Sequence, residues 1–171
     1  AFSKHGIAHC GESIQQEVAN NFWQLSVLPE ALLAAEVLQP QQELHAMHDV
    51  TEGGILGAIH EMASASGCGF EVHPDQIPVS TEVQQVADLF EIDPLRSIGA
   101  GSMIMSVKNG CEKTLLAALA AANIPAATVG TFTKDKQHMI GKPNGSTEPF
   151  NYDGIDPYWE AFFKALKTEL K

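Results

Sequence analysis

The chain has 171 residues, 44% hydrophobic and 18% charged, and its 21 acidic against 10 basic residues give a formal net charge of −11. This composition indicates one globular domain with a substantial core, and it excludes a disordered chain. It also argues against nucleic-acid backbones and anionic membrane surfaces as partners, because clustered Lys and Arg bind both. No stretch approaches the ~20 consecutive apolar residues of a membrane-spanning helix.

The cysteines are three in number and widely spaced, at positions 10, 68 and 111. An odd count at irregular spacing is not the pattern of a disulfide framework. The chain also shows no basic segment followed by an apolar one, as a secretory signal would. We therefore expect a cytoplasmic protein with reduced thiols.

The first forty residues are predicted to be mostly helical. Residues 28–38 are rich in helix formers, and Pro29 lies near their start, where a missing N–H costs little. Residues 12–22 are more polar and fit either a helix or extended chain.

The next segments alternate between strand and helix patterns. Residues 43–48 alternate apolar and polar, which predicts a short strand with Leu44, Ala46 and His48 on one face. A helix is expected over 55–67, ending at Gly67, and a strand over 69–73. A second amphipathic helix is expected over 81–90, where Thr81 and Gln84 could form a capping box.

The last third continues the pattern. An almost unbroken apolar run predicts a buried strand at 102–107, followed by a helix over 112–123 and a strand over 126–133. Residues 138–140 are expected to pair beside that strand across a turn at 134–136, and 143–146 form a loop. The closing helix, 156–170, would be capped by Asp156, with an apolar stripe of Trp159, Phe162, Phe163 and Leu166. Together these elements predict an α+β fold, a mixed sheet with helices packed on it, in a single domain spanning 1–171.

The most informative segment for chemistry is 47–54, where a strand leads into a turn and two glycines open a helix. Helix N-termini present unpaired N–H groups that receive anions, and glycines let the backbone approach a phosphate closely. Asp49, Thr51, Gly53 and Gly54 are therefore candidate phosphate-binding residues. An alternative remains open: the first two only cap the helix, and the glycines only pack it against the sheet.

A second glycine turn, at 97–102, leads into the expected buried strand. In a compact domain this turn and the first could face one pocket, which makes Gly101 and Ser102 further candidates. The alternative is a tight turn or bulge before a strand.

Metal ligands are sparse in the sequence. His5 and His9 would share a helix face beside Cys10, but no fourth ligand is apparent, so we expect no metal site.

Residues 45–54, continuing through His60-Glu61-Met62-Ala63, resemble the signature of the C-terminal domain of the AIR synthase-related superfamily. Its members include aminoimidazole ribonucleotide synthetase, selenophosphate synthetase and the hydrogenase-maturation protein HypE, and the likeness is closest to the HypE-like or AIR synthase-related branch. The turn at 99–102 resembles the second conserved turn of that family, and the resemblance covers most of residues 40–142.

The resemblance implies a function for this domain. In that family an ATP-binding N-terminal domain precedes this one, and the enzymes transfer the γ-phosphate of ATP to an acceptor in a cleft between the two domains. Asp49, Thr51, Gly53 and Gly54 would line that cleft, joined by Gly101 and Ser102. The catalytic residues remain unassigned, and the substrate would be a small or phosphorylated molecule.

The same resemblance implies that ATP and Mg²⁺ are bound with the N-terminal domain, which this chain lacks, so the chain would be inactive alone. The alternative is a non-catalytic binding or assembly module that retains the fold. Formation of a homodimer through an uncovered apolar face is a further option.

Overall fold

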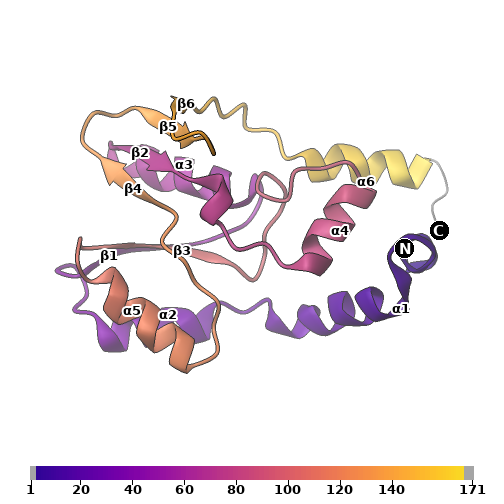
Figure 1. Ribbon diagram of the computed structural model, residues 1–171, viewed down its shortest axis with the longest axis horizontal. Coiled ribbons are helices and arrows are strands. Elements are labelled where there is room, and N and C mark those ends of the chain that lie inside the picture. The colour runs from indigo at the N-terminus through magenta and orange to yellow at the C-terminus, as the bar shows by residue number, and fades with distance from the viewer. Residues whose placement is uncertain (1–2, 168–171) are drawn as a thin grey trace.

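A computed structural model describes residues 3–167 of the protein, and Figure 1 shows their arrangement. The helices are α1 (Ser3–Asn21), α2 (Leu28–Val37), α3 (Gly54–Ser66), α4 (Thr81–Leu89), α5 (Glu112–Ala121) and α6 (Pro157–Lys167), with short 3-10 turns at Phe22–Gln24 and Pro74–Gln76. The strands are β1 (Leu44–Asp49), β2 (Gly69–Val72), β3 (Met103–Val107), β4 (Gly130–Thr133), β5 (His138–Gly141) and β6 (Thr147–Pro149).

The strands form two sheets. β1 and β3 pair antiparallel as a two-stranded sheet, and the other four follow the order β4-β2-β5-β6, in which β2 and β5 are parallel. Helix α3 contacts strands of both sheets, whereas α2 and α5 pack together beside β1. Figure 1 shows α2 and α5 on one side of the β1–β3 pair and α3 with the larger sheet on the other.

Two apolar cores hold these layers. The larger one joins α3 to both sheets and includes Leu56, Met62, Phe70 and Ile104. The smaller one lies under α2 and α5 and includes Ala34, Leu44 and Leu115. Helix α3 is therefore buried on several sides, and its N-terminus is fixed against the surrounding strands.

The predicted α+β class is confirmed, with two sheets in place of one. The expected helices at 28–38, 55–67, 81–90 and 112–123 all form with ends shifted by a few residues, and 12–22 is helical within α1. The burial of β1 alternates as predicted, with Leu44 buried and Met47 exposed. Gly67 ends α3 in a left-handed conformation at φ 64°, the geometry that glycine adopts most readily.

The expected pairing of 138–140 with the strand before it is wrong. β4 and β5 do not pair with each other, because β2 lies between them and bonds to both. Phe70 faces Phe132 on one side and His138 on the other, so the apolar strand takes the central position. β6, a segment for which the sequence pattern predicts no element, pairs with β5 and completes the edge.

Three local expectations also differ from the structure. The cap of α4 is Ser80, not Thr81, because the Ser80 hydroxyl accepts a hydrogen bond from the Val83 amide. In β3 only Ile104 is buried, since a two-stranded sheet covers little of its own surface. The stripe of α6 is not a core face, as Phe163 is 54% exposed, and residues 168–170 of the expected helix lie outside the described range.

No helix within residues 3–167 is both long and apolar enough to cross a bilayer. The three cysteines are unpaired and half-buried.

Candidate functional site

The two glycine turns lie side by side at the same end of the β1–β3 pair. The Val50 amide donates to the Ser102 carbonyl at 2.9 Å, and the Gly99 amide donates to the Thr51 carbonyl at 3.2 Å. These bonds continue the antiparallel pairing beyond Asp49 and Met103, the last residues in register. Two segments that are about fifty residues apart in the sequence thus form one continuous edge.

The six predicted residues divide into an exposed rim and a buried floor. Asp49, Thr51 and Ser102 are exposed, and 65% of the Asp49 side chain is accessible. Gly53 and Gly54 are buried, and Gly101 is half-buried. The structure therefore places all six residues at this edge. The three rim residues are exposed to solvent, and the three glycines are wholly or partly buried.

Close packing requires both buried glycines. A Cβ atom at residue 54 would lie 2.5 Å from the carbonyl oxygen of Leu95, and one at residue 53 would overlap the hydroxyl of Tyr152. Both residues also have positive φ, 79° at Gly53 and 65° at Gly54. Packing of the helix against its neighbours, which the sequence left open, is thus one role of these glycines.

The capping role considered for Asp49 and Thr51 is absent from the described structure. The N-cap of α3 is Gly53, a residue without a side chain that could cap the helix. The amides at this end instead use backbone carbonyls: Gly54 donates to Thr51 at 3.3 Å and Leu56 donates to Leu95 at 3.1 Å.

A carboxylate from the far end of the chain lies at the helix N-terminus. Asp156, 7% exposed, accepts the Gly53 amide through Oδ2 at 2.8 Å, and its Oδ1 accepts the Tyr158 amide at 2.8 Å. It therefore caps α6, as predicted, and also supplies a negative charge where a helix N-terminus favours one. No local pattern predicts the second contact, because Asp156 and Gly53 are 103 residues apart.

Sequence reasoning also missed His48, which neighbours the rim. Its Nε2 lies 2.9 Å from Glu61 Oε2 on α3, and its Nδ1 lies 3.6 Å from Asp49 Oδ1. The imidazole is thus held between two carboxylates. The only available signal was its position directly before Asp49 at the end of an alternating strand.

Tyr152 and His60 connect this edge to the interior of the fold. The two rings lie 4.9 Å apart, centroid to centroid. Burial, with the nearby carboxylates of Glu61 and Asp156, raises the pKa of Tyr152, so its hydroxyl stays neutral. Burial and the neighbouring His138 ring lower the pKa of His60.

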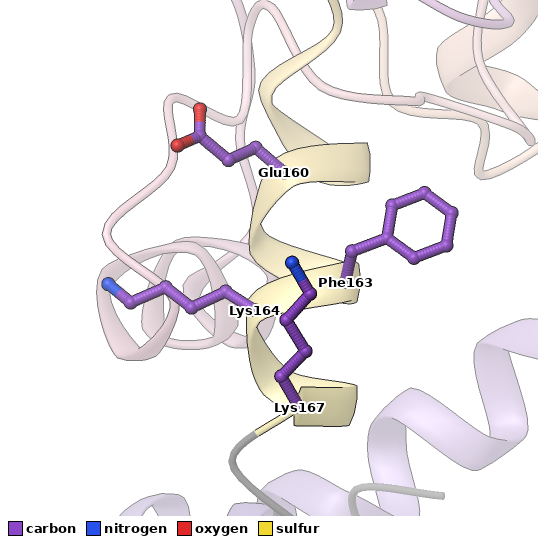
Figure 2. Close-up of a pocket in the computed structure, with 4 residues that line it drawn as sticks. All are labelled: Glu160, Phe163, Lys164 and Lys167. Carbon is purple, nitrogen blue, oxygen red and sulfur yellow. The ribbon is translucent and has the colours of Figure 1, made fainter.

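Two concave surfaces of the described structure lie away from this edge. One is lined by Glu160, Phe163, Lys164 and Lys167, and Figure 2 shows these side chains splaying from one helix, α6. Residues of a single helix surround a ligand on one side only, so we do not assign a site there.

Within the part of the chain whose side chains are described, no three His, Cys, Asp or Glu residues gather as a metal-binding group. The side chains of His5 and His9 are outside that part.

Comparison with known proteins gives the family context. Residues 6–141 match the family model described as AIR synthase related protein, C-terminal domain. Carbamoyl dehydratase HypE of Escherichia coli strain K12 is 35% identical over 74 residues, which cover 43% of this chain and 22% of that protein.

Solved structures agree with this match. A crystal structure of E. coli HypE has a TM-score of 0.67 at 25% identity, covering 78% of this chain and 41% of that one. A structure of the hydrogenase maturation protein HypE in complex with ATP shares the fold, with a TM-score of 0.60 at 19% identity over 70% of this chain and 39% of that one. This chain spans less than half the length of each of these relatives.

Proposed function

Because this chain belongs to the AIR synthase related family, whose C-terminal domain it represents, we propose that it is the substrate- and phosphate-binding domain of an ATP-dependent phosphotransfer enzyme of the HypE-like branch. The proposal includes inactivity of the domain alone, with ATP and Mg²⁺ bound together with an N-terminal domain. Carbamoyl dehydratase HypE is one of the proteins similar in sequence to this chain, and a solved structure of HypE is a complex with ATP.

The observation that carries this proposal is the joining of the two glycine turns by backbone hydrogen bonds. This arrangement sets the hydroxyls of Thr51 and Ser102 and the carboxylate of Asp49 along one exposed edge. Hydroxyl groups can donate to phosphate oxygens, and here they would do so without a lysine or arginine cluster.

The charge of the site favours a phosphate that carries a cation. Asp49 and the net charge of −11 repel a bare anion. Hard oxygen groups such as the Asp49 carboxylate and the Thr51 hydroxyl fit Mg²⁺, so the donor set is compatible with a magnesium-bound phosphate. Bound Mg²⁺ would supply charge neutralisation, and the protein residues would orient the phosphate.

Asp156 limits where the phosphate binds. The Gly53 amide already donates to its carboxylate, so phosphate would contact the rim residues first. Gly53 and Gly54 would then support the rim by packing α3 closely against Tyr152 and Leu95. A phosphate would bond to the Gly53 amide only by displacing the Asp156 carboxylate that this amide already contacts.

A surface for the N-terminal domain borders the same edge. Five large apolar side chains in the connection after α1 and in the first turns of α2 are exposed, and we call them the 22–32 surface: Phe22, Trp23, Leu25, Leu28 and Leu32. The Gly101 turn packs against the backbone of this segment, since a Cβ there would lie 3.1 Å from the Gln24 carbonyl oxygen. A domain docked on this surface would therefore close over the rim.

The test is a titration of the chain with inorganic phosphate and with Mg-ATP, followed by the amide signals of residues 49–54 and 99–102. We expect those signals to shift selectively. Replacing both Thr51 and Ser102 by alanine should weaken binding about tenfold or more, because each hydroxyl hydrogen bond contributes ~1 kcal/mol. Ser66→Ala, an exposed change at the end of α3, is the control and should have no effect.

A second candidate function is the non-catalytic assembly module. The specific observation in its favour is the internal carboxylate of Asp156 at the helix N-terminus, where a ligand anion was expected. No selective shift with either probe in the folded chain would refute the phosphate site and support this candidate.

A further inference from the structure

Two histidine rings from distant parts of the chain meet beside α3. The Nδ1 atoms of His60 on α3 and His138 on β5 lie 3.1 Å apart, although the residues are 78 positions apart in sequence. The rings are nearly perpendicular, at 89°, with centroids 4.8 Å apart. Their nitrogen atoms, rather than their ring faces, therefore approach each other.

Neighbouring side chains fix the orientation of both rings. Ser64, one turn further along α3, lies 3.4 Å from the Nε2 atom of His60. His138 stacks on Phe70, which is only 2% exposed, at a centroid distance of 4.6 Å and an angle of 22°. A metal-binding histidine commonly has its second nitrogen held in this way, which fixes the tautomer.

Two neutral imidazoles in this position share one proton. One Nδ1 must donate and the other must accept, because a second proton between them would set two N–H groups against each other. When the Nε2 of His60 bears its proton toward Ser64, its Nδ1 carries a lone pair directed at His138. Both rings are half-buried, so the pair is accessible from solvent.

We propose that His60 and His138 form a two-histidine binding site for a divalent cation of borderline softness such as Zn²⁺, in which the cation takes the place of the shared proton. Zinc–nitrogen bonds are about 2.0–2.1 Å, so nitrogens at the observed spacing would subtend roughly 100° at the ion, close to tetrahedral geometry. The His138 proton moves from Nδ1 to Nε2 by exchange with solvent, so both rings stay neutral, and two Zn–N bonds form with no net release of a proton and no change of oxidation state.

Water would complete the coordination shell. The protein supplies two ligands, since no third His, Cys, Asp or Glu joins them among the described side chains. The bound cation therefore keeps open positions, as in zinc sites that exchange ligands, and binding would be reversible. The net charge of −11 raises the local concentration of cations and favours this occupancy. This inference does not depend on the proposed phosphate site.

The experiment measures Zn²⁺ binding by calorimetry in a His5→Gln/His9→Gln background, which removes the histidine pair near the N-terminus. We expect one ion bound per chain. His60→Gln and His138→Gln should each weaken Zn²⁺ binding by at least about tenfold. This is the lower end of the loss in affinity seen when residues around a bound metal are changed. His45→Gln, at an exposed position of β1, should bind as the background does.

A second measurement avoids the risk that a variant unfolds. In the folded background protein, the ring nitrogen signals of His60 and His138 should shift on addition of Zn²⁺, while those of His45 and His73 stay in place. No binding, or binding that shifts other histidines and leaves His60 and His138 unchanged, would overturn the proposal and identify the contact as a hydrogen bond within the fold.

Discussion

Gly54 shows how strongly a single position at this edge is constrained. It has positive φ at 65°, and a Cβ there would lie 2.5 Å from the Leu95 carbonyl oxygen, a backbone atom that cannot rotate away. Gly54→Ala should therefore lower the free energy of unfolding by about 3 kcal/mol, the sum of a left-handed backbone penalty and displacement of the neighbouring loop. Urea denaturation measures this change.

Gly67→Ala is the matched control for that experiment. Gly67 has nearly the same φ, 64°, but a Cβ there meets no atom within 4 Å. The expected cost is the conformational penalty alone, about 1 kcal/mol. Equal losses in the two variants would show that the close approach at Leu95 does not constrain Gly54.

At the scale of elements, patterns within one element were predictable and contacts between elements were not. The helical spacing of apolar residues predicted α3, and the glycine at position 67 predicted its end, because both signals are local. The position of β2 between β4 and β5 depends on which strand best fills the centre of the sheet, which no local pattern encodes. The exposure of Phe163 was missed for the same reason, since an amphipathic stripe does not specify what covers it.

The candidate site also combines local patterns, which were predictable, with contacts between distant residues, which were not. The two glycine turns were visible in the sequence, which suggested that they could face one pocket, and the hydrogen bonds show them joined along one edge. Binding of phosphate there stays a prediction. The contact of Asp156 with Gly53 and that of His60 with His138 join residues 103 and 78 positions apart, so neither had a sequence signal.

The docking of α1 on α4 should depend on pH through Glu82. Its carboxylate accepts the Asn21 side-chain amide at 3.3 Å, and hydrogen bonds from its own backbone, Ser80 and Asn21 lower the pKa of Glu82 below its ordinary 4.5. A carboxyl with a lowered folded-state pKa stabilises the fold above its unfolded-state pKa, and this contribution is lost as pH falls through the folded-state value. The protection factors of the α1 amides, in which exchange rates are corrected for their intrinsic pH dependence, should therefore fall on acidification below about pH 4.5.

Glu82→Gln tests this assignment, because an amide does not titrate in this range. The variant should exchange its α1 amides faster than wild type near neutral pH, and the difference should shrink on acidification. Glu17→Gln, an exposed change on α1 itself, should preserve the wild-type pH dependence. An unchanged pH dependence in Glu82→Gln would assign the acid sensitivity of α1 to other carboxyls.

At the scale of the whole molecule, this acidic chain exposes a group of apolar side chains that are close together in the sequence, the 22–32 surface. Trp23 is 82% exposed and Phe22 63%, and their rings contact each other edge to face at 5.3 Å. Aromatic side chains dominate the energetics of protein interfaces, and an exposed group of them marks a contact site. The 22–32 surface lies against the Gly101 turn, so its occupant and the candidate phosphate rim would influence each other.

Trp23→Ser should separate association from stability. The side chain buries little in the described fold, so its loss should change the free energy of unfolding by no more than ~0.5 kcal/mol. If the 22–32 surface drives self-association of the isolated chain, the sedimentation coefficient at high concentration should fall in this variant. Phe163→Ser, at a 54% exposed position of α6, is the matched control and should sediment as wild type. The reverse result, with Phe163→Ser dissociating the chain and Trp23→Ser not, would place the contact on α6 and leave the 22–32 surface without a role in self-association.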